Sequence, residues 1–441
     1  MRKHAALIFL AWASPQASAQ DLLTTYEQSL QRNPGIRQAE ATRNAALENK
    51  PQSIAALLPT LSVSANLNQS WVTTKSGDSI QTNIAGGQFV NFWNSAPTLS
   101  LKQPIYHHDL WVQLSQADNQ VAAAEATYEA AQQSLIYNTA NAYFQILYAQ
   151  DSLEFARMEK QSIERQLEQA KARFEVGLIA ITDVDAAQAG FDQSRANEIK
   201  AENDLDNARE AMREIIGEFE GKISGLAVDI PLPPPVPADM EAWNQRAQET
   251  NLQIIAAQNQ ADISKKGIEV QFAGHYPTLD VVGTAGVTEN NRPHGVRTEF
   301  QIIGMQLNMP LFQGGMVNSK VRQAREQYQA DQENLDVQRR ATNKQVKIAY
   351  RGITTSISQV AALKSAVASA QSALDATEAG FEVGTRTMID VLLVQSKLYQ
   401  AKQNYAKARY DYITNSLSLK QASGILMRED VELVNRWLSK N

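Results

Sequence analysis

The sequence predicts an α+β fold that is mainly α, with four strands arranged as two hairpins. Three observations support this prediction. The chain of 441 residues contains only 21 Gly and 14 Pro, so breakers are scarce and the elements between them must be long. Period-two alternation is confined to two places, each followed by a long stretch that is poor in Gly and Pro. The chain also repeats its own landmarks, so one set of elements occurs twice.

The composition is that of an ordinary folded protein. Charged residues make up 20% of the chain, hydrophobic residues 43%, and there is no Cys. These values exclude disordered, collagen-like and disulfide-stapled classes, and the missing thiols exclude zinc–thiolate sites and cysteine nucleophiles. Asp and Glu residues, 47 in all, outnumber the 41 Lys and Arg residues. This balance argues against a nucleic-acid partner, which favours a basic face.

The N-terminus has the pattern of a secretory signal. A basic start, Met1-Arg2-Lys3-His4, precedes a short apolar stretch and the small residues Ala17-Ser18-Ala19. Residues 1–19 are therefore expected to be a signal peptide. A buried N-terminal helix is the alternative, and Pro15 argues against it. No run of 18 apolar residues follows, so we expect no transmembrane helix in the mature chain.

The chain is internally duplicated. Phe174-Glu175-Val176-Gly177 recurs as Phe381-Glu382-Val383-Gly384, and Pro59-Thr60-Leu61 recurs as Pro277-Thr278-Leu279. We expect a first structural repeat over 20–225, a Pro-rich linker over 226–238, a second repeat over 239–425 and a C-terminal segment over 426–441. The prolines favour an extended strap between the repeats. A polyproline ligand site is the weaker interpretation at a repeat boundary.

Each repeat is predicted to contain one two-stranded hairpin. Apolar and polar residues alternate over 61–71 and 98–102, and again over 279–287 and 302–309. The segment between residues 72 and 96 is longer than its counterpart, and we expect a surface loop there with Trp71, Phe92 and Trp93 as its aromatic shoulders. One face of each strand is aliphatic and the other carries many Ser, Asn and Thr residues. This pattern fits a half-buried sheet or a barrel wall with a wet lumen.

Four strands are too few to close a barrel. The smallest membrane barrels have about eight strands, and an open sheet edge in lipid leaves backbone groups unpaired. A barrel would therefore have to be shared between copies of the chain.

The rest of the sequence is predicted to be helical. Residues 107–176 contain no Gly or Pro, and at about 1.5 Å per residue they would form a rod of roughly 100 Å. Their Ala-rich seam, spaced by three and four, favours close helix packing in a curved wall. Residues 318–378 form the matching helix, which we expect to be broken at Gly352. Shorter helices are expected over 182–216, 387–423, 36–57 and 242–272.

Taken in order, these residues resemble the TolC family of outer-membrane efflux proteins over essentially the whole mature chain. The most specific marks are the tips Val176-Gly177-Leu178 and Val383-Gly384-Thr385 and the segment 310–319. The resemblance implies a homotrimer with a 12-stranded outer-membrane β-barrel, four strands per chain, continued by a 12-helix periplasmic α-barrel. It places the protein in the outer membrane of a Gram-negative cell, in contact with outer-membrane lipid and with a long periplasmic domain.

The function implied by the resemblance is a passive exit duct of a tripartite efflux pump or a type I secretion system. Its partners would be a periplasmic adaptor (membrane fusion protein) and an inner-membrane pump of ABC or RND type, whose docking opens the periplasmic end. No cofactor is implied. Small drugs, a secreted protein and metal ions all remain open as cargo.

The two tips are the candidate site. Gly177 and Gly384 predict helix caps, because Gly readily adopts the left-handed backbone. The resemblance adds adaptor contacts at Val176, Gly177, Leu178, Val383, Gly384 and Thr385. It also implies a periplasmic gate formed by Thr182, Asp183 and Arg386, with Gln166 as a further partner. A charge-assisted link between Arg386 and Asp183 could be broken by screening or by docking.

The sequence departs from the family pattern at two gate positions. Phe381 stands where a gate tyrosine is found, and Leu393 stands in the place of a second ring acid. Asp390 remains, and three converging copies would form a constriction that attracts cations. Its other interpretation is structural, because a carboxylate in the first turn stabilises a helix. With one acidic ring, we expect weaker block by cations.

An enzyme and a periplasmic scaffold are the alternatives to a duct. An enzyme is not predicted: His107-His108-Asp109 has no metal-site spacing, Gly314-Gly315 lacks a phosphate-loop Lys, and no nucleophile–base order is present. We therefore expect no catalytic residue and no metal ligand. The alternative function is a periplasmic coiled-coil adaptor or scaffold without a channel. The duplicated strand hairpins favour the duct.

Overall fold

The computed structural model describes residues 20–74, 88–219, 222–291 and 297–439. The expected signal peptide and most of the loop between residues 72 and 96 lie outside these ranges. The described chain divides into two compact units, each built from separate stretches of sequence. The first contains the described residues within 20–40, 128–254 and 339–439, and the second contains those within 41–127 and 255–338. No described helix is both long enough and apolar enough to cross a membrane.

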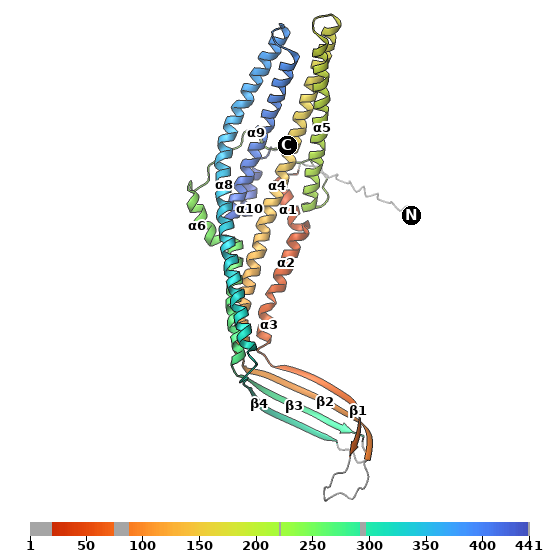
Figure 1. The fold of residues 1–441 in the computed structure, drawn as a ribbon, viewed down its shortest axis with the longest axis vertical. Helices are drawn as coiled ribbons and strands as arrows, with labels where there is room; N and C mark the ends of the chain where they lie inside the picture. The colour runs from red at the N-terminus through yellow and green to blue at the C-terminus, as the bar shows by residue number, and fades with distance from the viewer. Residues whose placement is uncertain (1–19, 75–87, 220–221, 292–296, 440–441) are drawn as a thin grey trace, which may run out of the picture. The chain divides into compact units, whose positions relative to one another are not determined.

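The second unit contains the four strands in one antiparallel sheet. The strands are β1 (Thr60–Thr74), β2 (Gln88–Tyr106), β3 (Thr278–Asn290) and β4 (Thr298–Asn308), in the spatial order β1-β2-β3-β4 (Figure 1). The predicted hairpins β1–β2 and β3–β4 are confirmed, and they join through β2 and β3. The strands are longer than the alternation suggested, so Trp71, Phe92 and Trp93 lie within strands and not in the loop.

One face of the sheet is aliphatic because the register pairs aliphatic residues with aliphatic residues and polar residues with polar residues. Leu61 pairs with Leu101 and Val63 with Leu99, while Ser62 pairs with Ser100 on the other face. Leu61 and Val63 are exposed in the single chain, as are the aliphatic residues of β4. Exposed aliphatic rows of this kind are the pattern of a wall that faces lipid.

Short helices lead into the sheet. They are α2 (Pro34–Leu47), α3 (Asn49–Ala55), α7 (Leu252–Phe272) and the 3₁₀ turn η1 (Ala273–His275). Where β2 passes into the next helix, the buried carboxylate of Asp280 on β3 accepts from His107 Nε2 at 2.9 Å and pairs with Lys102 Nζ at 3.1 Å. This cluster fixes the exit of β2 against β3.

Two long helices belong partly to each unit. They are α4 (His108–Glu175, 68 residues) and α8 (Met316–Glu382, 67 residues). The expected break at Gly352 is wrong, since α8 continues through it. Asn415 explains the glycine, because a Cβ on Gly352 would lie 2.8 Å from Asn415 Cγ. Gly352 therefore serves a close helix approach and does not end the helix.

The first unit is helical. It contains α1 (Leu22–Arg32), α5 (Ile181–Ile216), α6 (Met240–Thr250), α9 (Met388–Ala422) and α10 (Arg428–Asn435). A core that includes Tyr143, Phe144, Met212, Ile413 and Leu417 joins α4, α5 and α9. The Pro-rich linker runs alongside α9 in space. The Tyr412 hydroxyl of α9 donates to Pro233 O of the linker at 2.8 Å.

Two helices expected to be continuous are each divided. Residues 242–272 form α6 and α7, separated at Asn251, and residues 36–57 fall mostly within α2 and α3. The side chain of Asn251 accepts from the backbone N–H groups of Gln253 and Ile254 at 3.0 and 3.2 Å. A side chain that caps the following turn starts a new helix there.

Candidate functional site

The first tip joins α4 to α5 through a glycine turn. Gly177 has φ +75°, and its N–H donates to Phe174 O at 2.8 Å, while the N–H of Leu178 donates to Arg173 O at 2.9 Å. This pattern satisfies the last carbonyls of α4 and requires a left-handed residue, which Gly adopts without a Cβ penalty. Val176 and Leu178 are left exposed at the tip.

The second tip joins α8 to α9 in the same way. Gly384 has φ +79°, and the N–H of Thr385 donates to Gly380 O at 2.8 Å. The Thr385 hydroxyl donates to the same oxygen at 3.0 Å, and Val383 is exposed. The repeated sequence thus produces two helical hairpins, α4–α5 and α8–α9 (Figure 1). Each ends in a glycine cap beside exposed aliphatic residues.

Asp390 is held in a capping box at the start of α9. Its carboxylate accepts from the backbone N–H and the hydroxyl of Thr387, both at 2.9 Å, and its own N–H donates to the Thr387 hydroxyl at 3.2 Å. These hydrogen bonds, with a smaller effect of the Arg386 charge, lower the pKa of Asp390. The carboxylate is therefore ionised at neutral pH, and its hydrogen bonds to Thr387 hold it at the start of α9.

The corresponding start of α5 has no such box. Its N-cap is Ala180, which offers no side-chain acceptor, and Thr182 and Asp183 lie in the first turn. Thr182 is exposed and Asp183 half-buried. Among the residues that the structure describes, no ion pair within the chain joins Asp183 to Arg386. The expected link between them would have to form between neighbouring copies.

Gln166 is brought to a partner on the other hairpin. Its Nε2 donates to Glu378 Oε1 at 3.3 Å, joining the buried side of α4 to α8. Burial raises the pKa of Glu378, and the hydrogen bond from Gln166 acts in the opposite direction. The structure thus assigns Gln166 a partner that the sequence did not indicate, because 212 positions separate the two residues.

Phe381 also connects the hairpins. The guanidinium carbon of Arg173 lies 5.1 Å from the centroid of its ring, within the range of a cation–π contact. The ring also packs against the buried cluster of Leu167, Ala170 and Met388. The ring of Phe381 is thus bound by an arginine and by apolar neighbours. Sequence reasoning missed Arg173, which no motif includes.

Farther from the tips, the helices of the first unit enclose a groove of about 800 Å³. Its lining is mixed and comes from α4, α5 and α9, with polar side chains such as Asn141, Gln145 and Asn197 beside Ala and aromatic residues. The linker follows a different side of α9, since Tyr412 binds Pro233 and Arg409 binds Ala227 O. Asp411 and Thr414 line the groove. Two positions along a helix correspond to a rotation of about 200°, so Asp411 lies nearly opposite Arg409, and Thr414 nearly opposite Tyr412. The groove therefore faces away from the linker.

These features belong to a known family. The family model described as "Outer membrane efflux protein" matches residues 25–218 and 243–425. The chain belongs to the outer membrane efflux protein family.

Curated relatives of this family extend over nearly the whole chain. The outer membrane protein TolC of Vibrio cholerae is 39% identical over 95% of this chain and 94% of its own length. The alkaline protease secretion protein AprF of Pseudomonas aeruginosa is 28% identical over 97% of this chain and 89% of its own. The predicted family is therefore confirmed.

Solved structures of other outer-membrane channels share the fold. The Campylobacter jejuni CmeC outer membrane channel has a TM-score of 0.79 at 15% identity, with 100% of this chain and 98% of that chain covered. The predicted α+β, mainly α fold is confirmed. Membership of the family makes the protein an outer-membrane exit duct for efflux and secretion, with a long periplasmic part, and a transport protein rather than an enzyme.

Proposed function

We propose that three copies of this outer membrane efflux protein form a passive duct, closed at its periplasmic end by the hairpin tips and opened when a partner docks there. The observation that carries the proposal is the sheet in each chain. It has an exposed aliphatic face and two edge strands, β1 and β4, whose outer edges pair with no other strand of the described chain. Three such sheets would close into a 12-stranded barrel without leaving an edge in lipid.

The duct itself needs no binding pocket for cargo. The groove on the side of the helices away from the linker supports an inner wall that water can wet, since Asn, Gln and charged residues form part of its mixed lining. Such a wall lets polar cargo pass without a specific site. Energy for transport would come from an inner-membrane pump of ABC or RND type.

Docking would take place at the tips. Val176, Leu178 and Val383 are exposed aliphatic residues beside rigid glycine caps, and Thr385 completes the second turn. A small apolar knob on a rigid turn is suited to packing against a helical hairpin of a periplasmic adaptor. The alternative function, an adaptor or scaffold without a channel, is not favoured by family membership or by the fold.

The gate would consist of links within and between copies. Gln166 and Glu378 join the hairpins of one chain, and Arg386 would reach Asp183 or Thr182 of the neighbouring copy. Arg386 and Thr182 are exposed and Asp183 is half-buried. A charge-assisted link at an exposed site is weakened by salt and by a docked partner, which suits a latch.

Single-channel conductance in a planar bilayer tests the proposal. Wild type is expected to conduct weakly, and Arg386→Ala and Asp183→Ala are expected to conduct more. Arg195→Ala, on the same helix as Asp183 but away from the tip, is the matched control and should conduct as wild type does. A protein that stays monomeric and gives no conductance would overturn the duct.

A further inference from the structure

The apolar side chains with the greatest exposure in the second unit flank one edge of the sheet. The segment 309–316, here named the β4 exit turn, follows β4 and leads into α8. Its Leu311 and Phe312 are each 87% exposed. Gly314 and Gly315 follow with φ of +60° and +82°, and a Cβ on either would meet no atom within 4 Å. The turn is therefore open on the side of these residues.

The opposite edge of the sheet has an apolar turn at the same end. The segment 54–59, here named the β1 entry turn, connects α3 to β1 and exposes Ile54 and Leu58, by 42% and 54%. The register places the two turns at one end of the sheet, because Thr60, Lys102, Val282 and Gly304 lie in one row across the four strands. β1 begins in this row, and β4 ends four residues beyond Gly304. Figure 1 shows the start of β1 and the end of β4 at the same end of the sheet.

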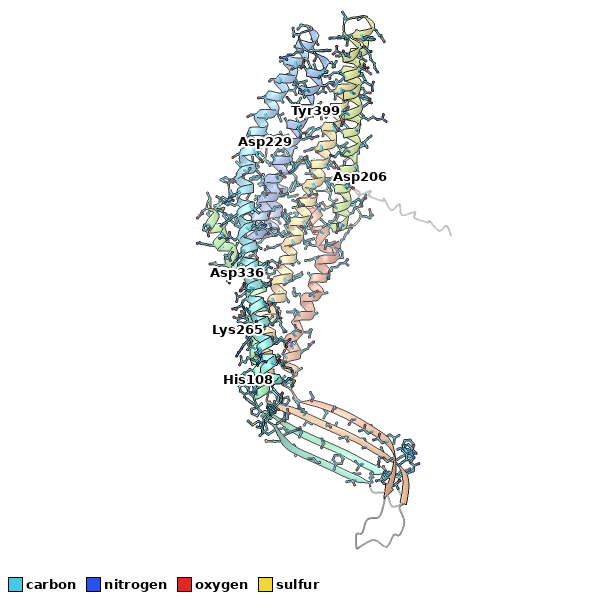
Figure 2. All side chains as sticks on the ribbon, viewed as in Figure 1. His108, Asp206, Asp229, Lys265, Asp336 and Tyr399 are labelled. Carbon is cyan, nitrogen blue, oxygen red and sulfur yellow. The ribbon has the colours of Figure 1, made fainter. Side chains whose placement is uncertain are left out.

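The two inner strands end differently. Where β2 leads into α4, the ring of Tyr106 packs edge-on against Trp111 at 5.3 Å. Where η1 leads into β3, Tyr276 packs against His108 at 5.1 Å and Phe272 at 5.7 Å, and Figure 2 shows His108 where the helix meets the sheet. The rings at the inner junctions pack on one another yet stay half exposed, with Trp111 at 46% and Phe272 at 43%, whereas Leu311 and Phe312 beside β4 are each 87% exposed.

This difference indicates what covers the turns. A lipid surface would contact the junctions of all four strands alike, and membrane interfaces favour Trp and Tyr. The most exposed residues here are a Leu and a Phe beside an edge strand only. A second copy of this chain reaches only the edges. The order β1-β2-β3-β4 makes β1 and β4 antiparallel to each other, so β4 of one copy can extend the sheet through β1 of the next.

We propose that Leu311 and Phe312 of one protomer pack against Ile54 and Leu58 of the neighbouring protomer, at the foot of each seam between sheets. The contact rests on the trimeric duct proposed above. It buries the two most exposed apolar side chains of the β4 exit turn and fastens the seam at the end nearest the helices. The seam would then depend on side chains as well as on backbone pairing.

Cysteine cross-linking tests the contact directly, because the natural chain has no Cys. The double variant Leu58→Cys with Phe312→Cys, treated in the detergent-solubilised full chain with a short bis-maleimide, is expected to give a ladder of covalent dimer and trimer. Each single variant should remain monomeric on a denaturing gel. The pair Leu58→Cys with Val337→Cys is the matched control, since Val337 is also exposed, on α8, and it should give no ladder.

The outcomes separate this contact from the trimer itself. A trimer on a native gel without cross-linking by the first pair overturns the contact and leaves the duct standing. Monomers on the native gel overturn both. Quenching of a fluorophore at position 312 by brominated lipid in vesicles would assign the turn to the membrane and also overturn the contact.

A polar substitution measures how much the contact contributes. Phe312→Ser is expected to shorten the half-life of the trimer in denaturing detergent by about tenfold or more, because burying a Phe is strongly favourable. Val337→Ser makes the same type of change at an exposed site and should alter the half-life by less than about twofold. Equal half-lives for wild type and Phe312→Ser would contradict the proposal.

Discussion

Arg173 on α4 lies over the ring of Phe381 on α8, with its guanidinium carbon 5.1 Å from the ring centroid. The contact crosses from one helical hairpin to the other, one turn before each tip. Phe381 has no hydroxyl, so the link at this position depends on the face of the ring. The two hairpins of the chain are therefore joined at this position by a contact between a cation and an aromatic ring.

A double-mutant cycle tests this contact. Arg173→Met keeps most of the side-chain packing and removes the charge, and Phe381→Leu keeps an apolar side chain and removes the ring. We expect a coupling free energy of about 0.5–1 kcal/mol between them, the usual range for a cation–π pair that is partly exposed. Chemical unfolding of the detergent-solubilised protein measures it. Additive effects within error would show that the two residues do not interact.

The hydrogen bond between Gln166 and Glu378 gives a second prediction. In Gln166→Glu two carboxyl groups face each other in a half-buried site, and their repulsion at pH 8 should separate the hairpins. We expect single-channel conductance to rise more than about twofold at pH 8. At pH 5 the rise should be smaller, because burial raises the pKa of Glu378 and one proton can be shared.

The control for this prediction exchanges the two groups. Gln166→Glu combined with Glu378→Gln restores one amide and one carboxylate at the same positions, and its conductance should return toward wild type. A single variant that conducts as wild type does at both pH values would show that this hydrogen bond does not hold the gate.

Local pattern explains how far the sequence could predict this fold. The alternation of apolar and polar residues predicted the two hairpins. The stretch 107–176, which has no Gly or Pro, predicted α4 almost to its ends. The failures have local causes that only packing reveals. Gly352 was expected to break α8, yet it accommodates Asn415, and Asn251 divides two helices by capping the second.

The candidate site was predictable where its chemistry is local. Gly177, Gly384 and the pair Thr387 and Asp390 follow from short-range rules for caps. The contacts of Gln166 with Glu378 and of Arg173 with Phe381 join residues more than 200 positions apart. Nothing in the periodicity of either helix indicates which residue of the other it will face.

Glu159 on α4 gives a prediction about pH. The side chain is buried, and burial raises its pKa from 4.5 to about 6. Because the folded state binds the proton more tightly than the unfolded state, this group's contribution to stability is complete below pH 4.5 and is lost as the pH rises through about 6. The ionisable neighbour on α9 is Tyr399, which Figure 2 labels and whose own pKa is raised mainly by burial and further by Glu159.

Glu159→Gln should therefore stabilise the protein at pH 7.5 and have little effect at pH 4.5. We expect a gain of about 1 kcal/mol at the higher pH, less than the full pKa shift implies because solvent screens part of the site. Thermal unfolding at the two pH values measures the change. Glu164→Gln, at an exposed position of the same helix, should show no such dependence. A lower midpoint for Glu159→Gln at pH 7.5 would mean that the ionised carboxylate has a stabilising partner.

Asp390 has two roles that substitutions can separate. Asp390→Asn removes the charge and keeps an acceptor for the Thr387 N–H, whereas Asp390→Ala removes both. If three copies form a negative ring, block of the channel by a trivalent cation should weaken equally in the two variants, because only charge matters to the ion.

Helix stability should fall by about 1 kcal/mol more in Asp390→Ala, because the capping box is lost. Asp206→Asn, at an exposed aspartate on α5 (Figure 2), is the matched control and should be blocked as wild type is. Equal block of wild type and the three variants would show that Asp390 serves only as a helix cap. The lowered pKa of its carboxyl is explained first by its hydrogen bonds to Thr387 and does not require a ring.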